Sequence, residues 1–159
     1  MTSPATHGVA ELLRLIHNLI RLGTVAEVDH AAARCRVQVG EILTGWLPWL
    51  ELRAGTTRDW DPPTLGEQVL VLSPGGEPAA GIVVTGLYQA AHPAPADSPN
   101  LQRRLYPDGT RQQHNHATSH WHLSVPAGGK IELEIGRTRL TLEDGQTRLY
   151  TPDFEAIRT

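Results

Sequence analysis

Cysteine is almost absent from this chain of 159 residues, because Cys35 is the only one. A single cysteine excludes an intrachain disulfide framework, and a lone thiol fits a reducing compartment. Cys35 stands in an alternating, strand-like run, so we expect it to pack as a small buried hydrophobe rather than to act as a reactive thiol.

Lysine is equally scarce. Lys130 is the only lysine, the other basic residues are arginines, and the formal net charge is −3. A nucleic-acid-binding domain usually carries a clustered basic face. The composition therefore argues against nucleic acid as a partner.

Long apolar runs are missing as well. No stretch approaches the ~20 apolar residues that a bilayer-spanning helix needs. The N-terminus also lacks the basic region, apolar core and cleavage site of a secretion signal. We expect a protein that is made and assembled in a cytoplasm.

The first predicted segment covers residues 1–23 and contains a helix over 9–22. Gly23 follows as the expected C-terminal stop. A helix of this length is too short to be stable alone, so it must dock on its own domain, a sister chain or a partner. Its apolar residues fall at helical spacing on one side: Val9, Leu12, Leu13, Ile16, Leu19 and Ile20.

Residues 24–89 contain a series of short strand patterns with no internal helix. About five such runs in ~65 residues suit a small closed barrel, of which the OB-fold is one kind. We therefore predict an all-β protein with one short N-terminal helix and an OB-fold-like barrel. The runs, each bounded by turn residues, are 24–28, 34–39, 44–50, 68–72 and 80–84.

Two further segments complete the predicted organisation. Residues 90–105 form a proline-rich linker, which is expected to be extended and fairly stiff. Residues 106–159 form an arm of short strands cut by glycine-containing turns, a pattern that suits a stacked β-helix or β-prism. One face of this arm carries an apolar stripe, namely Ile131, Leu133, Ile135, Leu140 and Leu142.

The apolar stripe predicts an oligomer. An isolated narrow sheet is marginally stable in water, and no later helix or second sheet is available to cover the stripe. A closed ring of identical chains is the simplest source of a cover. We therefore expect these five side chains to pack in a symmetric assembly of intertwined arms.

Several motifs, taken in order along the chain, resemble one known family. The match is dense from 23 to 109 and looser afterwards. The chain is similar to the baseplate assembly protein V family, which supplies the central spike of contractile phage tails and tailocins. The motifs are Gly23-Thr24-Val25-Ala26-Glu27-Val28-Asp29, Arg34-Cys35-Arg36-Val37, Trp46-Leu47-Pro48-Trp49, Arg53-Ala54-Gly55, Trp60-Asp61-Pro62-Pro63, Gly66-Glu67-Gln68-Val69, Ser73-Pro74-Gly75-Gly76, Asp97-Ser98-Pro99 and Tyr106-Pro107-Asp108-Gly109.

The resemblance implies a non-enzymatic homotrimer, with an OB-fold domain at the tail hub and three arms wound into a membrane-piercing needle. Its implied partners are hub and baseplate proteins and, transiently, the outer membrane of the target cell. The implied location is the baseplate of a phage or tailocin particle, assembled in the bacterial cytoplasm. Spikes of this family usually end in a His-x-His pair that holds iron, but residues 150–159 contain no histidine. Either the needle is short, the chain is cut, or a separate protein supplies the tip.

A histidine-rich run, 114–122, holds the candidate metal ligands. On one unbroken strand its four histidines would share a face. Threefold symmetry would then bring His114 and His116 of each chain to a common axis, where six imidazoles suit an octahedral iron or nickel ion. A turn at 116–119 would instead split the pairs and leave solvated histidines. No carboxylate lies between 112 and 125 to complete a catalytic zinc site, so we predict no catalytic residues and no resident cofactor.

One alternative function uses the aromatic residues. OB-folds bind single-stranded nucleic acid or sugar by stacking, often within a basic groove. Here nearby Asp and Glu residues offset the arginines, so we favour core or intersubunit packing for the tryptophans. The residues concerned are Trp46, Trp49, Trp60 and Trp121, with Arg34, Arg36, Arg53 and Arg58.

Overall fold

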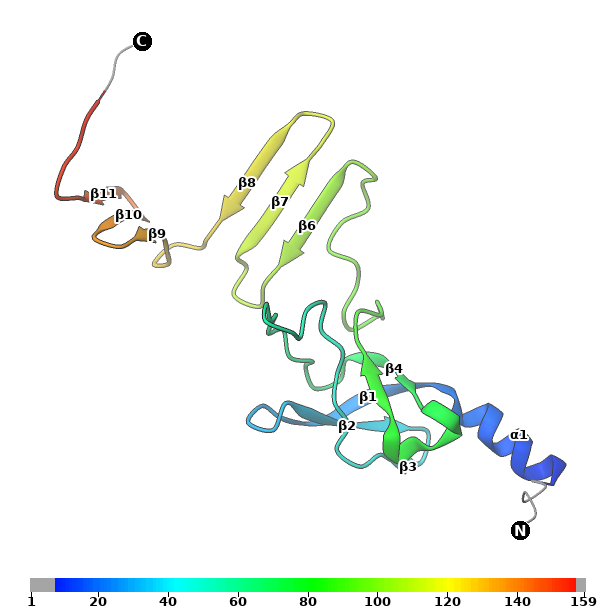
Figure 1. The fold of residues 1–159 in the computed structure, drawn as a ribbon. Coiled ribbons are helices and arrows are strands. Elements are labelled where there is room, and N and C mark those ends of the chain that lie inside the picture. Colours follow the sequence, from blue (N-terminus) through cyan, green and yellow to red (C-terminus); the bar gives the residue numbers. More distant parts are fainter. Residues whose placement is uncertain (1–7, 157–159) are drawn as a thin grey trace. The chain divides into compact units, whose positions relative to one another are not determined.

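The computed structural model describes residues 8–156, and it divides into two units, one up to Pro93 and one from Ala94 onward. Among the described residues, no helix is long and apolar enough to cross a membrane. The elements labelled in Figure 1 are α1 (Val9–Asn18), β1 (Ile20–Asp29), β2 (Arg34–Val39), β3 (Ile42–Leu43), β4 (Gln68–Leu72), β5 (Ile82–Val84), β6 (Leu101–Leu105), β7 (Arg111–Asn115), β8 (His120–Ser124), β9 (Lys130–Ile135), β10 (Thr138–Glu143) and β11 (Gln146–Tyr150). Two short 3₁₀ turns, Pro74–Gly76 and Pro78–Ala80, lie between β4 and β5, where the sequence predicted no helix.

The first unit is a closed barrel. Strands β3, β2, β1, β4 and β5 form one sheet in that order. Residues 44–50 close this sheet by pairing with β2 and with β5. On one side, Leu47 and Cys35 of β2 exchange two backbone hydrogen bonds, both of 2.9 Å. On the other, the Val83 amide of β5 donates to the Pro48 carbonyl at 2.9 Å, within a parallel pairing. The predicted OB-fold-like barrel is therefore confirmed.

The barrel interior is built from small branched side chains. Each principal strand contributes to it, because inward and outward positions alternate along a strand. Cys35 is fully buried, as the sequence predicted. The interior residues are Val25, Cys35, Val37, Val39, Leu47, Val69, Val71 and Val83, with Val28 and Trp49 packed against them.

Burial should protect the Cys35 thiol from chemical modification. Burial, with a smaller effect from the Glu67 charge, raises the pKa of Cys35 to about 11. Because the thiolate is the reactive form, we expect very slow labelling by an aromatic disulfide reagent at about pH 8, and immediate labelling in denaturant. The measurement is absorbance of the released thiolate under both conditions. Equal labelling rates in the two conditions would contradict the buried position.

The helix ends earlier than predicted. Helix α1 stops at Asn18, not Leu22, and β1 begins at Ile20. Ile20 pairs with Leu72 of β4, and Leu22 pairs with Leu70 of the same strand. Helical spacing was present in this stretch, but strand pairing with β4 prevailed over local propensity. Residues 1–7 of the predicted N-terminal segment lie outside the described residues.

Gly23 is therefore not a helix stop. It lies within β1 opposite Val69. A Cβ at this position would lie 2.4 Å from Val37 Cγ1 and 2.8 Å from the Gln38 carbonyl oxygen. Glycine is needed here because β1 passes very close to β2.

Helix α1 contacts its own domain through few apolar side chains. A Cβ at Gly76 would lie 2.4 Å from the Leu15 carbonyl oxygen, so the helix backbone presses on the turn after β4. Arg14 also forms an ion pair with Glu77 at 3.6 Å. The predicted apolar side stays exposed, so a sister chain or another protein remains its predicted cover. Its residues are Val9, Leu12, Leu13, Ile16, Leu19 and Ile20.

The second unit contains two three-stranded antiparallel sheets, β6–β7–β8 and β11–β10–β9. Strand β6 corrects the predicted linker, because Leu101–Leu105 pair with β7 from Leu101 opposite Asn115 to Leu105 opposite Arg111. Its central residues are all polar, so the strand has no alternating pattern of its own. It is held in place by hydrogen bonding to β7.

Candidate assembly surface

The apolar stripe lies on one face of the sheet formed by β9, β10 and β11. Leu133 is directly opposite Leu140, and Ile131 is directly opposite Leu142. Directly opposed residues of antiparallel strands point to the same face. The five predicted side chains therefore share one face, as their alternation indicated.

Strand β11 widens this apolar face. Leu149 lies opposite Leu140, so it joins the stripe from the third strand. We did not identify Leu149 from the sequence, although the alternation in 146–150 contains the signal. The stripe is open to solvent in the single chain, with Leu133 63% exposed and Ile135 84% exposed.

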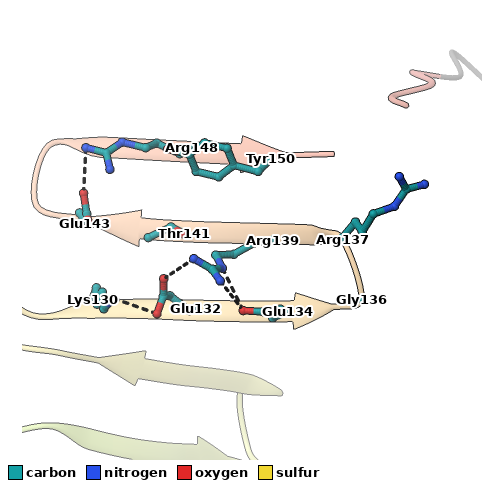
Figure 2. Close-up of a pocket in the computed structure, with 10 residues that line it drawn as sticks. All are labelled: Lys130, Glu132, Glu134, Gly136, Arg137, Arg139, Thr141, Glu143, Arg148 and Tyr150. Carbon is teal, nitrogen blue, oxygen red and sulfur yellow. Dashed lines mark hydrogen bonds and ion pairs between the residues drawn. The ribbon is translucent and has the colours of Figure 1, made fainter. Parts of the chain in front are cut away.

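The opposite face of the same sheet is charged, and Figure 2 shows its side chains. Arg139 forms an ion pair with Glu134 at 2.8 Å, and Lys130 forms one with Glu132 at 2.9 Å. On the neighbouring strand, Arg148 lies 3.3 Å from Glu143. Two of these pairs join neighbouring strands, while the Lys130–Glu132 pair runs along β9. A face of paired charges is suited to contact with water rather than with an apolar partner.

A threonine is buried beneath these charges. Thr141 is only 5% exposed, although it points to the charged face, because Glu132 and Arg148 lie directly opposite it. The hydrogen bond from Lys130 is the main cause that lowers the pKa of Glu132 below its ordinary value. The hollow above these residues measures about 480 Å³ and is lined by alternating charges, with Tyr150 at its edge. We see in it no nucleophile held by a base.

The histidines are split by a turn, which is the second arrangement that the sequence allowed. Strand β7 ends at Asn115 and β8 begins at His120. His114 lies opposite Trp121, with ring centroids 5.8 Å apart, while His116 lies in the turn. Within residues 8–156, no three His, Cys, Asp or Glu side chains come together as a metal site.

The tryptophans differ in how far they are buried. Trp49 contacts the core and lies 5.6 Å from the Trp60 ring, and its indole N–H donates to Glu51 at 2.9 Å. Arg36, a candidate for a basic groove, is instead paired with Glu27 at 2.9 Å. These contacts favour packing over base stacking for Trp49, whereas Trp46, Trp60 and Trp121 are 44%, 59% and 59% exposed.

Comparison with known proteins shows which family this chain resembles. Residues 21–88 match the family described as the Type VI secretion system/phage-baseplate injector OB domain. The chain is also 37% identical over 163 aligned residues to a spike protein of Escherichia phage P2. That match covers 92% of this chain and 77% of the phage P2 protein. This chain belongs to the baseplate protein V family.

Membership of the baseplate protein V family confirms the resemblance drawn from the motifs. The matched range begins in β1 and ends beyond β5, so it covers the closed barrel. The longer match to the phage P2 protein extends the relationship into the second unit, where the apolar stripe lies.

Proposed function

We propose that this protein is the structural spike at the tip of a contractile tail, working as a homotrimer whose arms pack through the apolar stripe. The observation that carries this proposal is the aligned stripe on β9, β10 and β11, which is largely exposed in the single chain. Burying one such side chain stabilises an assembly by roughly 1.5–3 kcal/mol. Three copies of the stripe would then make dissociation slow.

The mechanism is mechanical rather than catalytic. Sheath contraction drives the tube forward, and the needle transmits axial force into the target envelope. Pulling one chain out of the assembly would break many ladder hydrogen bonds at once and expose its stripe to water. The charged face of the same sheet suits the water-facing side of such a needle.

The proposed partners follow from the family. We propose hub and other baseplate proteins as partners, which the family's description as a phage-baseplate injector domain supports. The exposed side of α1 offers one surface for a hub protein or a sister chain. We propose the baseplate of a phage or tailocin particle as its location, after assembly in the bacterial cytoplasm. A separate tip protein remains part of this proposal.

Solution mass tests the trimer directly. Multi-angle light scattering of the intact chain should give three times the 17.4 kDa of one polypeptide. Elemental analysis of the same peak tests for a metal ion on the threefold axis, held by His114 and His116 of each chain. If such an ion is bound, the expected ratio is one transition-metal ion per three chains. A folded, protease-resistant monomer would refute the trimer.

A further inference from the structure

The segment that contains β6, β7 and β8 is rich in basic residues, whereas the chain as a whole has a net negative charge. The chain as a whole has 17 acidic residues against 14 basic ones. From 98 to 131, however, Asp108 is the only acid. The stretch from β6 to β8 carries three arginines and half of the eight histidines: Arg103, Arg104, Arg111, His114, His116, His120 and His122.

One face of this sheet gathers two arginines and two histidines. His122 lies opposite Gln113, which lies opposite Arg103, and Arg111 lies one pair further along the same face. His120 points to this face too, because its ring stacks on that of His122 at 5.7 Å and 13°. The other positions of the face are apolar or neutral: Leu101, Leu105, Gln113, Asn115 and Ser124. We call Arg103, Arg111, His120 and His122 the cationic face.

The two arginines differ in their surroundings. Arg103 is held in place, since it donates to the Pro95 carbonyl at 2.8 Å and to Gln113 at 3.1 Å. Arg111 is exposed, and its side chain has no hydrogen-bond or ion-pair partner among residues 8–156. The cationic face thus combines one fixed guanidinium with one that is available to a ligand.

Carboxylates do not neutralise this face. Asp108 lies in the turn between β6 and β7, where it accepts hydrogen bonds from the amide and hydroxyl of Thr110, which lower its pKa. Asp97 precedes β6 and pairs with neither Arg103 nor Arg111 within the described part of the chain. The reverse face carries Arg104 and His114, and His116 lies in the following turn.

We propose that the cationic face binds the phosphate headgroups of an anionic membrane surface, and that binding strengthens on acidification. Guanidinium groups bind phosphate oxygens through charge-assisted hydrogen bonds. Histidine gains positive charge between pH 8 and pH 5 in ordinary settings. Two stacked imidazolium rings would repel each other, and an anion bound beside them offsets that repulsion. This inference rests on the proposed function, in which the spike meets the target envelope.

Vesicle binding by the full-length chain tests the inference. Phosphatidylcholine vesicles with and without phosphatidylglycerol are compared at about pH 7.5 and about pH 5.5 by co-sedimentation. Arg111→Gln should weaken binding to the anionic vesicles about fivefold, the effect of one cation at such a surface. His120→Gln combined with His122→Gln should abolish the strengthening at the lower pH.

Arg137→Gln is the matched control. Arg137 also has no partner in the described residues, and Figure 2 shows it extending from the turn, apart from the ion pairs of the charged face. The control removes the same charge from a turn beside the glutamates of β9, so vesicle binding should stay close to that of the unmodified chain. Equal losses from Arg111→Gln and Arg137→Gln would overturn the inference, because they would indicate general charge attraction only.

Other outcomes also decide the matter. Equal binding to vesicles without phosphatidylglycerol, or no binding at all, would overturn it. Tighter binding to a single-stranded DNA oligonucleotide than to anionic vesicles would replace the membrane with nucleic acid as the partner. Light scattering on the unmodified chain and on each variant separates this inference from the proposed function. If the unmodified chain is a trimer but does not bind anionic vesicles, only the role of the cationic face is refuted. If the unmodified chain is a monomer, the proposed trimer is refuted.

Discussion

Leu133→Asp should leave the protein monomeric. Leu133 stands at the middle of the apolar stripe, directly opposite Leu140, and is 63% exposed in the single chain. In a trimer packed through this stripe the new carboxylate would be buried without a partner, which costs several kcal/mol per chain. Light scattering should show the mass of one chain, and a trimer of normal thermal stability would contradict the packing proposed for the arm.

Leu52→Asp controls for the substitution itself. Leu52 is 94% exposed and belongs to the barrel unit, outside the proposed contact. The same chemical change there should leave the trimer intact. Protection of Cys35 from labelling shows in both variants that the barrel is still folded. Loss of the trimer in Leu52→Asp as well would mean that the measurement reports solubility rather than the stripe.

Gly23→Ala should destabilise the barrel strongly. The added methyl group would stand 2.4 Å from Val37 Cγ1 and 2.9 Å from Val39 Cγ2, and it would also meet the Gln38 carbonyl. Neither neighbour can withdraw, because Val37 and Val39 are core residues of β2. Overpacking of this kind costs about 1–3 kcal/mol. The loss should appear as a lower midpoint of denaturant unfolding, followed by tryptophan fluorescence.

Gly45→Ala is the control for Gly23→Ala. A Cβ at Gly45 would meet no atom within 4 Å. Both variants remove the same glycine flexibility from the unfolded chain, so the difference between their midpoints isolates the steric contact. If the two midpoints agree, β1 does not approach β2 as closely as described.

Alternation predicted the strands that bury one face. Strand β2 was predicted with its observed bounds, Arg34–Val39, and β4 likewise over Gln68–Leu72. The stripe on β9 and β10 was also found from its period of two. In each case the side chains themselves carry the signal, because a half-buried strand must place apolar groups at every second position.

Pairing partners decided the elements that the sequence missed. Leu101–Leu105 became β6 because β7 lies beside it, although its own pattern is polar. The two-residue strand Ile42–Leu43 forms in the same way, by pairing with the end of β2. Ile20 to Leu22 suit a helix equally well, and only β4 makes them a strand. The cationic face also depends on the pairing of β6, β7 and β8, because their register places its four residues on one side of the sheet.

From its residues alone, this chain could be assigned to a family, to a barrel with a short helix, and to an arm with one apolar side, because those properties depend on local order along the chain. The close passage of β1 over β2, the closure through residues 44–50 and the separation of the histidines arose only when distant strands met. Hydrogen bonding between segments far apart in sequence leaves little trace in either segment, which is why the folded structure was needed to find them.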